Sequence, residues 1–269
     1  MNINKIAEII EEKGYKAVVH EIPKGSTIKM GISIGEGTVR PTIYPDQFEA
    51  FELSDDEIAD KVIELYEKNK NKTPNFDTSN IMKLDYIKEN AFVTVRRPIM
   101  DNSYTKAFLD MQLVLNVKVS GLEDDEFASY KVSKKQAEVI GLTEDIFDEA
   151  INNTRFSVRT MGEVVKSIAP DEEILDYGLY IVSNERRTQG AAAIYNMELF
   201  KSFADLIDSD LVIIPSSIHE LIVVKYDSGI SIDGLNNMVK ETNEIQVLPE
   251  EQLSDHVYIF NRSTNSLTY

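Results

Sequence analysis

The sequence predicts an α+β fold with mixed or largely antiparallel sheets, packing helices and two or three subdomains. Short runs of β-branched and aromatic residues, bounded by Gly, Pro, Asn and Asp, are typical of strands. Between several of these runs, apolar residues recur at helical spacing. Strands and helices do not alternate regularly, so the pattern favours neighbouring antiparallel strands covered by helices. A chain of 269 residues, 42% of them hydrophobic, can build a substantial core.

An N-terminal α/β subdomain is expected over residues 1–75. Isoleucines share one face of a predicted helix over residues 3–13, and Gly14 suits the left-handed position after its end. Ser54 and Glu57 match a capping box, in which both side chains satisfy free backbone amides where a helix begins. The remaining expected features are strands at 16–21, 27–34 and 38–43, and a polar linker at 69–73.

A middle subdomain of strands and a helix pair is expected over residues 76–170. Two short helices are predicted to begin at Ser133 and Thr143, with Gly141 ending the first. The acidic run 123–126 is expected at the tip of a loop. The other expected elements are a helix at 81–90 and strands at 91–95 and 113–119.

A C-terminal α+β subdomain is expected over residues 171–269, after an acidic segment at 169–176. A polar turn is predicted at 184–189, and Asp233 is expected to cap a helix. The other expected elements are strands at 179–183, 191–195, 211–214, 221–226 and 257–260 and a helix at 197–207.

Composition argues against several classes of function. The chain has no cysteine, so disulfides, thiolate metal sites and cysteine nucleophiles are excluded. A net charge of −18 opposes direct binding to nucleic acid or to an anionic membrane surface. The N-terminus lacks the apolar core of a signal peptide, and no apolar run is long enough to span a membrane. We therefore expect a cytoplasmic protein with no cofactor.

The segment LVIIPSSIHELIVVKY, residues 211–226, places a histidine and two serines between two apolar runs. Ser216, Ser217, His219 and Glu220 supply the residue types of a serine hydrolase, which needs a hydroxyl, a base and a group that orients the base. Neighbouring side chains on one turn seldom converge in that geometry, and the chain has no Gly-x-Ser-x-Gly elbow. The alternative is a purely structural role, in which the serines cap backbone groups of a turn and the His219 side chain supports the two strands.

Binding sites are predicted from charge and spacing. The three histidines are far apart in sequence, without the spacing of a metal site, so no metal is expected. Arginine pairs stand out in an acidic chain, because a guanidinium is suited to carboxylate or phosphate; they are Arg96-Arg97 and Arg186-Arg187. The alternative is a structural role, in which these arginines form ion pairs with nearby acidic side chains. If a small anion binds, the expected contacts are Asn184, Arg186, Arg187 and His219.

Several segments resemble a family of domains of unknown function that is common in gut Firmicutes and often encoded near mobile elements. The most specific of them is PSSIHELIVV at 215–224. The others are PTIYPDQFEAF at 41–51 with the DDEIADKVIELYE helix after it, KENAFVTVRRPI at 88–99, AFLDMQLVLNVKV at 107–119 and LYIVSNERRTQGAAAIY at 179–195. The chain departs from the family at Lys29-Met30-Gly31, where a longer polar turn is expected. The resemblance implies a bacterial cytoplasmic protein and carries no catalytic residues.

Three hypotheses of function follow. The first is a non-enzymatic accessory or binding protein of mobile-element cargo type, acting in host–element conflict through a protein partner. The second is a small-molecule hydrolase that uses His219 with Ser216 or Ser217. The third is an acidic DNA mimic that inhibits a restriction or CRISPR nuclease; residues 121–176 hold 14 acids and 6 bases, but the acids are interleaved with apolar residues. The sequence leaves the oligomeric state open.

Overall fold

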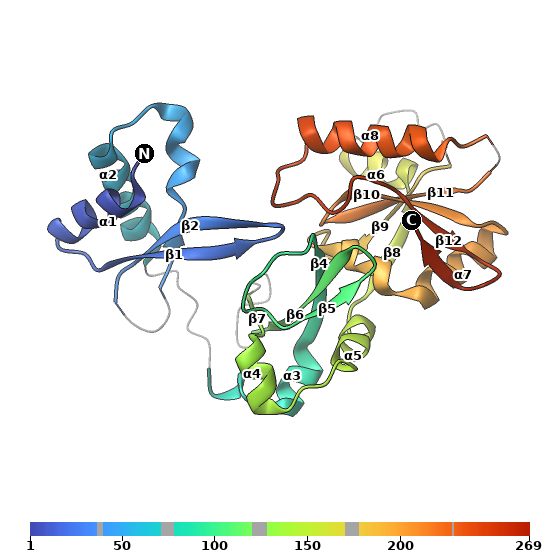
Figure 1. Ribbon diagram of the computed structural model, residues 1–269, viewed down its shortest axis with the longest axis horizontal. Coiled ribbons are helices and arrows are strands. Elements are labelled where there is room, and N and C mark those ends of the chain that lie inside the picture. The colour runs from blue at the N-terminus through green and yellow to red at the C-terminus, as the bar shows by residue number, and fades with distance from the viewer. Residues whose placement is uncertain (37–39, 71–77, 120–127, 170–177, 228) are drawn as a thin grey trace. The chain divides into compact units, whose positions relative to one another are not determined.

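The computed structural model describes residues 1–36, 40–70, 78–119, 128–169, 178–227 and 229–269 (Figure 1). It confirms the predicted α+β class with antiparallel sheets. The chain divides into two compact units, Met1–Phe76 and Asp77–Tyr269. None of the helices in the described residues is long and apolar enough to cross a lipid bilayer. The expected linker at 69–73, the acidic loop at 123–126 and the boundary at 169–176 lie wholly or largely outside the described residues.

The first unit is a three-stranded antiparallel sheet packed against two helices. Its elements are α1 (Ile3–Glu12), β1 (Ala17–Lys24), β2 (Thr27–Ile34), β3 (Thr42–Ile43), the 3₁₀ helix η1 (Pro45–Phe51) and α2 (Asp55–Asn69). The capping box that begins α2 is present, because Ser54 accepts from the backbone of Glu57 and the Glu57 carboxylate accepts from that of Ser54. Gly14 follows α1 with a φ of 92°, as expected. The core lies where α1 and α2 cover buried isoleucines of β2.

The second unit contains two antiparallel sheets. The four-stranded sheet consists of β4 (Ala91–Arg96), β6 (Met111–Lys118), β5 (Thr105–Phe108) and β7 (Ser129–Lys131). The six-stranded sheet has the order β13 (Ser266–Thr268), β12 (Tyr258–Asn261), β10 (Leu211–Ser217), β11 (Glu220–Lys225), β9 (Tyr180–Asn184) and β8 (Phe156–Thr160). One hydrophobic cluster joins side chains of both sheets, so the segments expected as middle and C-terminal parts share a core.

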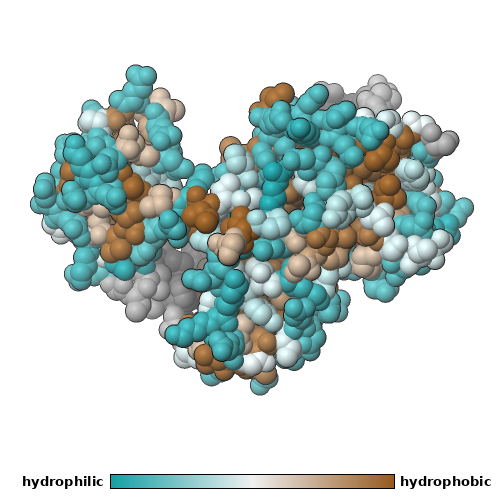
Figure 2. Space-filling model, in the orientation of Figure 1, coloured by the Kyte–Doolittle hydropathy of each residue, from teal (hydrophilic) through white to brown (hydrophobic). Residues whose placement is uncertain are grey.

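Helices cover both faces of the six-stranded sheet. Helix α8 (Ile232–Ile245) covers one face, and η4 (Gly190–Tyr195) and α7 (Met197–Ile207) cover the other. Helices α3 (Leu84–Asn90) and α5 (Ile146–Asn152) pack against the four-stranded sheet. The other helices of this unit in the described residues are η3 (Thr78–Asn80), α4 (Lys134–Ile140) and α6 (Met161–Ile168). Strand β10 has apolar side chains on both faces of the sheet: Leu211 and Ile213 enter the shared core, while Val212 and Ile214 belong to the cluster under α8. Helix α8 lies above the sheet, and hydrophilic residues predominate on its outward face (Figures 1 and 2).

Some sequence predictions are wrong. Residues 191–195 are not a strand but the 3₁₀ helix η4, because three consecutive alanines coil tightly in the core and Ala191 donates its N–H to the carbonyl of Ile218. Ser231, not Asp233, caps α8, since its hydroxyl accepts from the backbone N–H of Gly234. Helix α3 begins at Leu84 and α5 at Ile146, each three residues later than predicted. Strands β5, β7, β8 and β13 and helix α6 were not predicted.

Candidate functional site

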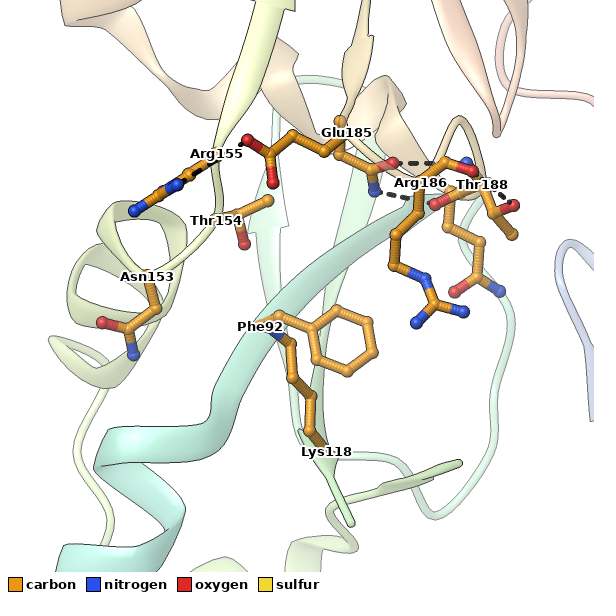
Figure 3. Close-up of a pocket in the computed structure, with 10 residues that line it drawn as sticks. Phe92, Lys118, Asn153, Thr154, Arg155, Glu185, Arg186 and Thr188 are labelled. Atoms are coloured by element: carbon orange, nitrogen blue, oxygen red, sulfur yellow. Dashed lines mark hydrogen bonds and ion pairs between the residues drawn. The ribbon is translucent and has the colours of Figure 1, made fainter. Parts of the chain in front are cut away.

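A pocket of about 270 Å³ lies within the second unit (Figure 3). It is formed where β4 begins, where β6 ends, at the connection from α5 to β8, and at the turn that follows β9. Its lining residues are Phe92, Lys118, Asn153, Thr154, Arg155, Asn184, Glu185, Arg186, Thr188 and Gln189. The polar turn predicted at 184–189 is therefore one wall of the cavity.

Internal hydrogen bonds fix that turn, residues 184–189. The Asn184 side-chain amide donates to the carbonyl of Thr188 at 2.8 Å, and its oxygen accepts from the backbone N–H of Thr188 at 3.2 Å. The backbone N–H of Arg187 donates to the carbonyl of Asn184 at 3.0 Å. Arg187 and Gln189 have φ values of 53° and 57°, in the left-handed region. Because the backbone is closed on itself, the turn presents the Arg186 side chain from a defined position.

The hairpin between β10 and β11 holds this turn from behind. The carbonyl of His219 accepts from the backbone N–H of Gly190 at 3.0 Å and from the Ser183 hydroxyl at 2.8 Å. A Cβ atom on Gly190 would overlap Ser183 Oγ and the backbone nitrogen of Asn184, and would lie 2.9 Å from the carbonyl of His219. Only glycine lets the two segments approach this closely. The most specific segment of the family resemblance thus supports a wall of the pocket.

The ring of His219 has a partner at each nitrogen. Nδ1 lies 3.1 Å from the backbone nitrogen of Gln189, which donates to it, and Nε2 lies 3.3 Å from Glu251 Oε1. Since Nδ1 accepts, the neutral ring carries its proton on Nε2 and donates it to the carboxylate. Ser217 Oγ accepts from the backbone N–H of His219 at 3.1 Å. In the described residues no hydrogen bond joins a hydroxyl of Ser216 or Ser217 to the ring.

The hydrolase candidates therefore lie in a tight hairpin. Ser216 and Ser217 end β10, Glu220 begins β11, and a register shift lies between Pro215 and Ser217. None of these residues lines the pocket. This arrangement is the one expected for a structural role, in which serine caps a backbone group and His219 connects neighbouring segments.

The pocket is positively charged in a strongly acidic protein. Lys118, Arg155 and Arg186 line it, against one acid, Glu185. Arg155 Nη1 is 3.9 Å from Glu185 Oε1, at a rim where both side chains are largely exposed. Lys118 Nζ has no hydrogen-bond or ion-pair partner in the described parts of the chain. Figure 3 shows Arg155 beside Glu185 at one side, and Arg186 extending from the turn toward the side where Phe92 and Lys118 lie.

The structure brings some of the predicted ligand contacts together and separates others. Asn184 and Arg186 line the pocket, whereas Arg187 and His219 do not. Of the other arginine pair, Arg96 is buried in an ion pair with Asp101 and Arg97 pairs with Asp255, so both serve the fold. The roles of these residues in ligand binding stay predictions. Sequence reasoning missed Phe92, Lys118 and residues 153–155, which carry no local signal.

A second polar cluster ties β12 to the turn between β5 and β6. Asp110 accepts from the hydroxyl of Tyr258 at 2.6 Å and lies 3.0 Å from Nε2 of His256. Burial, together with the hydrogen bond to Asp110, raises the pKa of the Tyr258 hydroxyl far above its usual range. His256 stacks on Tyr269, with ring centroids 4.7 Å apart. In the described residues no group of three or more His, Asp or Glu side chains is placed to hold a metal ion.

Comparison with curated proteins and with solved structures finds no match. One family, described as "Family of unknown function (DUF5688)", matches residues 2–262. This match covers nearly the whole chain and includes both walls of the pocket and the hairpin behind it. The chain therefore belongs to this family of unknown function.

Proposed function

We propose that this protein is a non-enzymatic binding protein whose pocket beside residues 184–189 takes a small anionic ligand. One observation carries the proposal: three cations and one acid line a cavity of about 270 Å³ in a chain of net charge −18. Random placement of charges would give such a chain an acidic pocket. A small cavity with convergent polar groups is the usual form of a ligand site.

The fixed backbone of the turn supports binding by Arg186. A side chain presented from a closed, hydrogen-bonded turn loses less freedom when a ligand binds than one on a mobile loop. Guanidinium groups form strong, directional hydrogen bonds with carboxylates and phosphates. Arg186 therefore provides the main contact in the proposal, with Lys118 as a second cation.

Binding is favoured over hydrolysis because His219 is already engaged. A general base must reach the proton that it removes, but both ring nitrogens of His219 contact other groups. The resemblance to a family encoded near mobile elements supports an accessory role, in which a ligand is sensed or sequestered without conversion. The cytoplasm, where small phosphorylated and carboxylated molecules are abundant, is the proposed location.

Adjacent arginines provide a matched test. Arg186→Gln and Arg187→Gln remove the same charge from neighbouring positions of one turn, but only Arg186 lines the pocket. The probes are inorganic phosphate, citrate and a panel of phosphorylated and carboxylated metabolites, titrated by isothermal calorimetry. We expect Arg186→Gln to weaken binding by about tenfold or more, as loss of a charge-assisted hydrogen bond does.

Arg187→Gln should change the same affinity by less than about threefold, since it alters only long-range charge, which salt screens. Equal losses in the two variants would show a diffuse charge effect and contradict a site at the pocket. Failure of every anion to bind would overturn the proposed function. Turnover of any probe that stops on Ser217→Ala would instead support the hydrolase.

A further inference from the structure

We propose that the outer edge of strand β8 binds an extended, acidic segment of a partner protein, which adds to the six-stranded sheet as one more strand. This site goes beyond the proposed function, because it lies along the edge of the sheet and not in the pocket for a small anion. Three features of β8 support it: its register against β9, the backbone groups that this register leaves open, and two arginines.

The register of β8 against β9 determines which backbone groups point outward. At one end of the ladder Glu185 donates its N–H to the carbonyl of Arg155 at 3.3 Å, and at the other Met161 donates to Leu179 at 2.8 Å. Hydrogen-bonded and non-hydrogen-bonded pairs alternate along an antiparallel ladder. Residues 155, 157, 159 and 161 therefore bond to β9, and residues 156, 158 and 160 direct their backbone groups away from it.

The outward backbone groups of β8 are open to a partner. Strand β8 is the last strand of its sheet, and in the described residues no hydrogen bond reaches the N–H or carbonyl of Phe156 or Val158 on the outer side. The N–H of Thr160 donates to the Glu163 carboxylate at 2.8 Å, so the open edge ends there. Helix α6 contacts β9 as well as β8, so it lies over a face of the sheet. An open row of donors and acceptors is a template for another strand.

Strand β8 lacks features that block pairing at other sheet edges. In the first unit, the edge strand β1 contains Pro23, which has no N–H to donate. At the opposite edge of the six-stranded sheet, β13 has only three residues. Strand β8 has five residues, no proline and a regular register without a bulge. Its edge is therefore suited to strand addition, a common mode of peptide recognition.

Two arginines give this edge a preference for acidic partners. Arg155 directly precedes β8, and Arg159 follows four residues later, so both lie on one face, roughly 13 Å apart. Arg159 has no hydrogen bond or ion pair with the described residues. Arg155 approaches Glu185 only at 3.9 Å, and both of these side chains are largely exposed. Carboxylates on a strand beside β8 would face these guanidinium groups.

Alternation along β8 predicts the pattern of the partner segment. Phe156 and Val158 pack against the hydrophobic cluster shared by the two sheets, on the face opposite the arginines. A partner strand should therefore place apolar residues opposite Phe156 and Val158, and acids opposite Arg155 and Arg159. The expected segment is an acid, an apolar residue, any residue, an apolar residue and an acid.

A second copy of this chain is a poor occupant of the edge. Antiparallel pairing of two β8 strands over their full length would centre on Ser157. It would place Arg155 of each copy opposite Arg159 of the other. Like charges directly opposite each other destabilise a pair of strands. The same arginines that attract an acidic segment therefore oppose self-association.

Synthetic peptides test the site on the full chain. The probe is fluorescein-labelled Gly-Ser-Glu-Val-Ser-Val-Glu-Ser-Gly, and the control peptide has lysine in place of both glutamates. We expect the acidic peptide to bind about tenfold or more tightly than the lysine peptide in fluorescence anisotropy. Two further forms of the acidic peptide carry backbone N-methyl groups on one or the other set of alternate residues. Since only one set of N–H groups can face β8, one form should lose about tenfold or more in affinity and the other should retain it.

Val158→Pro tests the backbone of the edge. It removes an outward N–H but no hydrogen bond to β9, and proline is tolerated at such an edge position. We expect it to weaken the acidic peptide by about fivefold or more. Val158→Ala is the matched control, because it trims the side chain and keeps the N–H, and it should change the affinity by less than about twofold. If Val158→Pro does not fold, the N-methylated peptides decide the same question.

Arg159→Gln tests the charge. It should weaken the acidic peptide by about threefold or more at low salt and leave the lysine peptide no weaker. Arg187→Gln removes the same charge from the turn after β9, away from the edge, and should change the affinity by less than about twofold.

Hydrogen exchange locates the bound peptide. In the free protein, the amides of Phe156 and Val158 should exchange faster than those of Ser157 and Arg159, which bond to β9. The acidic peptide should slow the exchange of Phe156 and Val158 by about tenfold or more and change the other two much less.

The outcomes separate this site from the pocket. Equal binding of the two N-methylated forms, equal binding of the acidic and lysine peptides, or no binding at about 1 mM peptide overturns the inference. A dimer of the protein alone that Val158→Pro dissociates would assign the edge to a second copy and also overturn it. If the peptide binds and no small anion does, the edge stands and the proposed function fails. If small anions bind and the peptide does not, the reverse holds, since Arg159 does not line the pocket.

Discussion

His219 Nδ1 accepts the backbone N–H of Gln189 at 3.1 Å, although the two residues are 30 positions apart. This bond joins the hairpin of β10 and β11 to the turn that walls the pocket. An imidazole is a suitable partner there, because one nitrogen can accept from a left-handed backbone position while the other donates to Glu251. The histidine thus acts on the shape of the pocket without lining it.

His219→Ala should loosen the turn. We expect the free energy of unfolding to fall by about 1 kcal/mol, the usual net value of a lost hydrogen bond. Binding of the anion probe should weaken as well, because Gln189 and Arg186 lose their fixed positions. Urea denaturation and calorimetry measure the two effects. His219→Asn is the control, since its side-chain oxygen can take the place of Nδ1; wild-type binding by His219→Ala would contradict the role.

Gly190→Ala should be more damaging. The added methyl group would overlap Ser183 Oγ and the backbone of Asn184, and the backbone cannot move aside without breaking the contacts to His219. We expect a loss of roughly 1–3 kcal/mol, typical of overpacking in a tight site. Gly234→Ala is the matched control, because residue 234 lies in the first turn of α8, where alanine is a better helix former, and its added Cβ would meet the Ser231 side chain at 3.2–3.3 Å and no backbone atom. Thermal denaturation should separate the two variants clearly.

Ser217→Ala distinguishes binding from hydrolysis. In the structure this hydroxyl caps the backbone N–H of His219, so its removal should cost about 1 kcal/mol or less and leave anion affinity nearly unchanged. Ser216→Ala should be neutral, because the Ser216 hydroxyl makes no such contact with the described residues. A serine hydrolase would instead lose all turnover of an activated ester in one of the two variants. Denaturation and an ester-cleavage assay on the same preparations decide between these outcomes.

Elements with strong local signals were predicted well. The helix at 197–207 and the strand at 27–34 have their predicted limits, and the capping box at Ser54 is present. Apolar periodicity and caps are properties of neighbouring residues, so they can be read from the sequence. Short edge strands such as β7 and β13 were missed because three residues are too few to establish a period.

Tertiary contacts explain the other misses. The alanine side chains of η4 are short enough for the start of this helix to hydrogen-bond to the segment that contains His219. No residue pattern in the sequence predicts that contact. Positive φ occurs at Arg187 and Gln189, which are not residue types that usually adopt it, because hydrogen bonds within the turn and to the hairpin impose the path of the chain. The sequence predicts only one part of the pocket, the polar turn at 184–189. Phe92 and Lys118 are distant in sequence and reach the pocket only when the chain folds.

The buried pair of Arg96 and Asp101 gives a prediction about pH. Burial pushes the pKa of Asp101 up, but hydrogen bonds from Arg96, and from the backbone and hydroxyl of Ser103, outweigh it and hold the pKa below its usual value. The side chains of the pair are only 3% and 6% exposed. Removal of one partner from such a pair costs roughly 3–5 kcal/mol, so Asp101→Asn should be strongly destabilising at neutral pH.

The sign of the pH effect follows from the lowered pKa of Asp101. The unfolded carboxyl, with a pKa of about 3.9, takes up a proton before the folded one does as the pH falls. The stability that this carboxylate contributes is therefore complete above about pH 4–5 and is lost as the pH falls through the folded pKa. Urea denaturation of wild type and Asp101→Asn from pH 7 to pH 3 should show two curves that converge in acid. Asp85→Asn, an exposed change in the first turn of α3, should remain within about 0.5 kcal/mol of wild type throughout. A gap for Asp101→Asn that stayed constant with pH would show that the loss comes from packing and not from the charge.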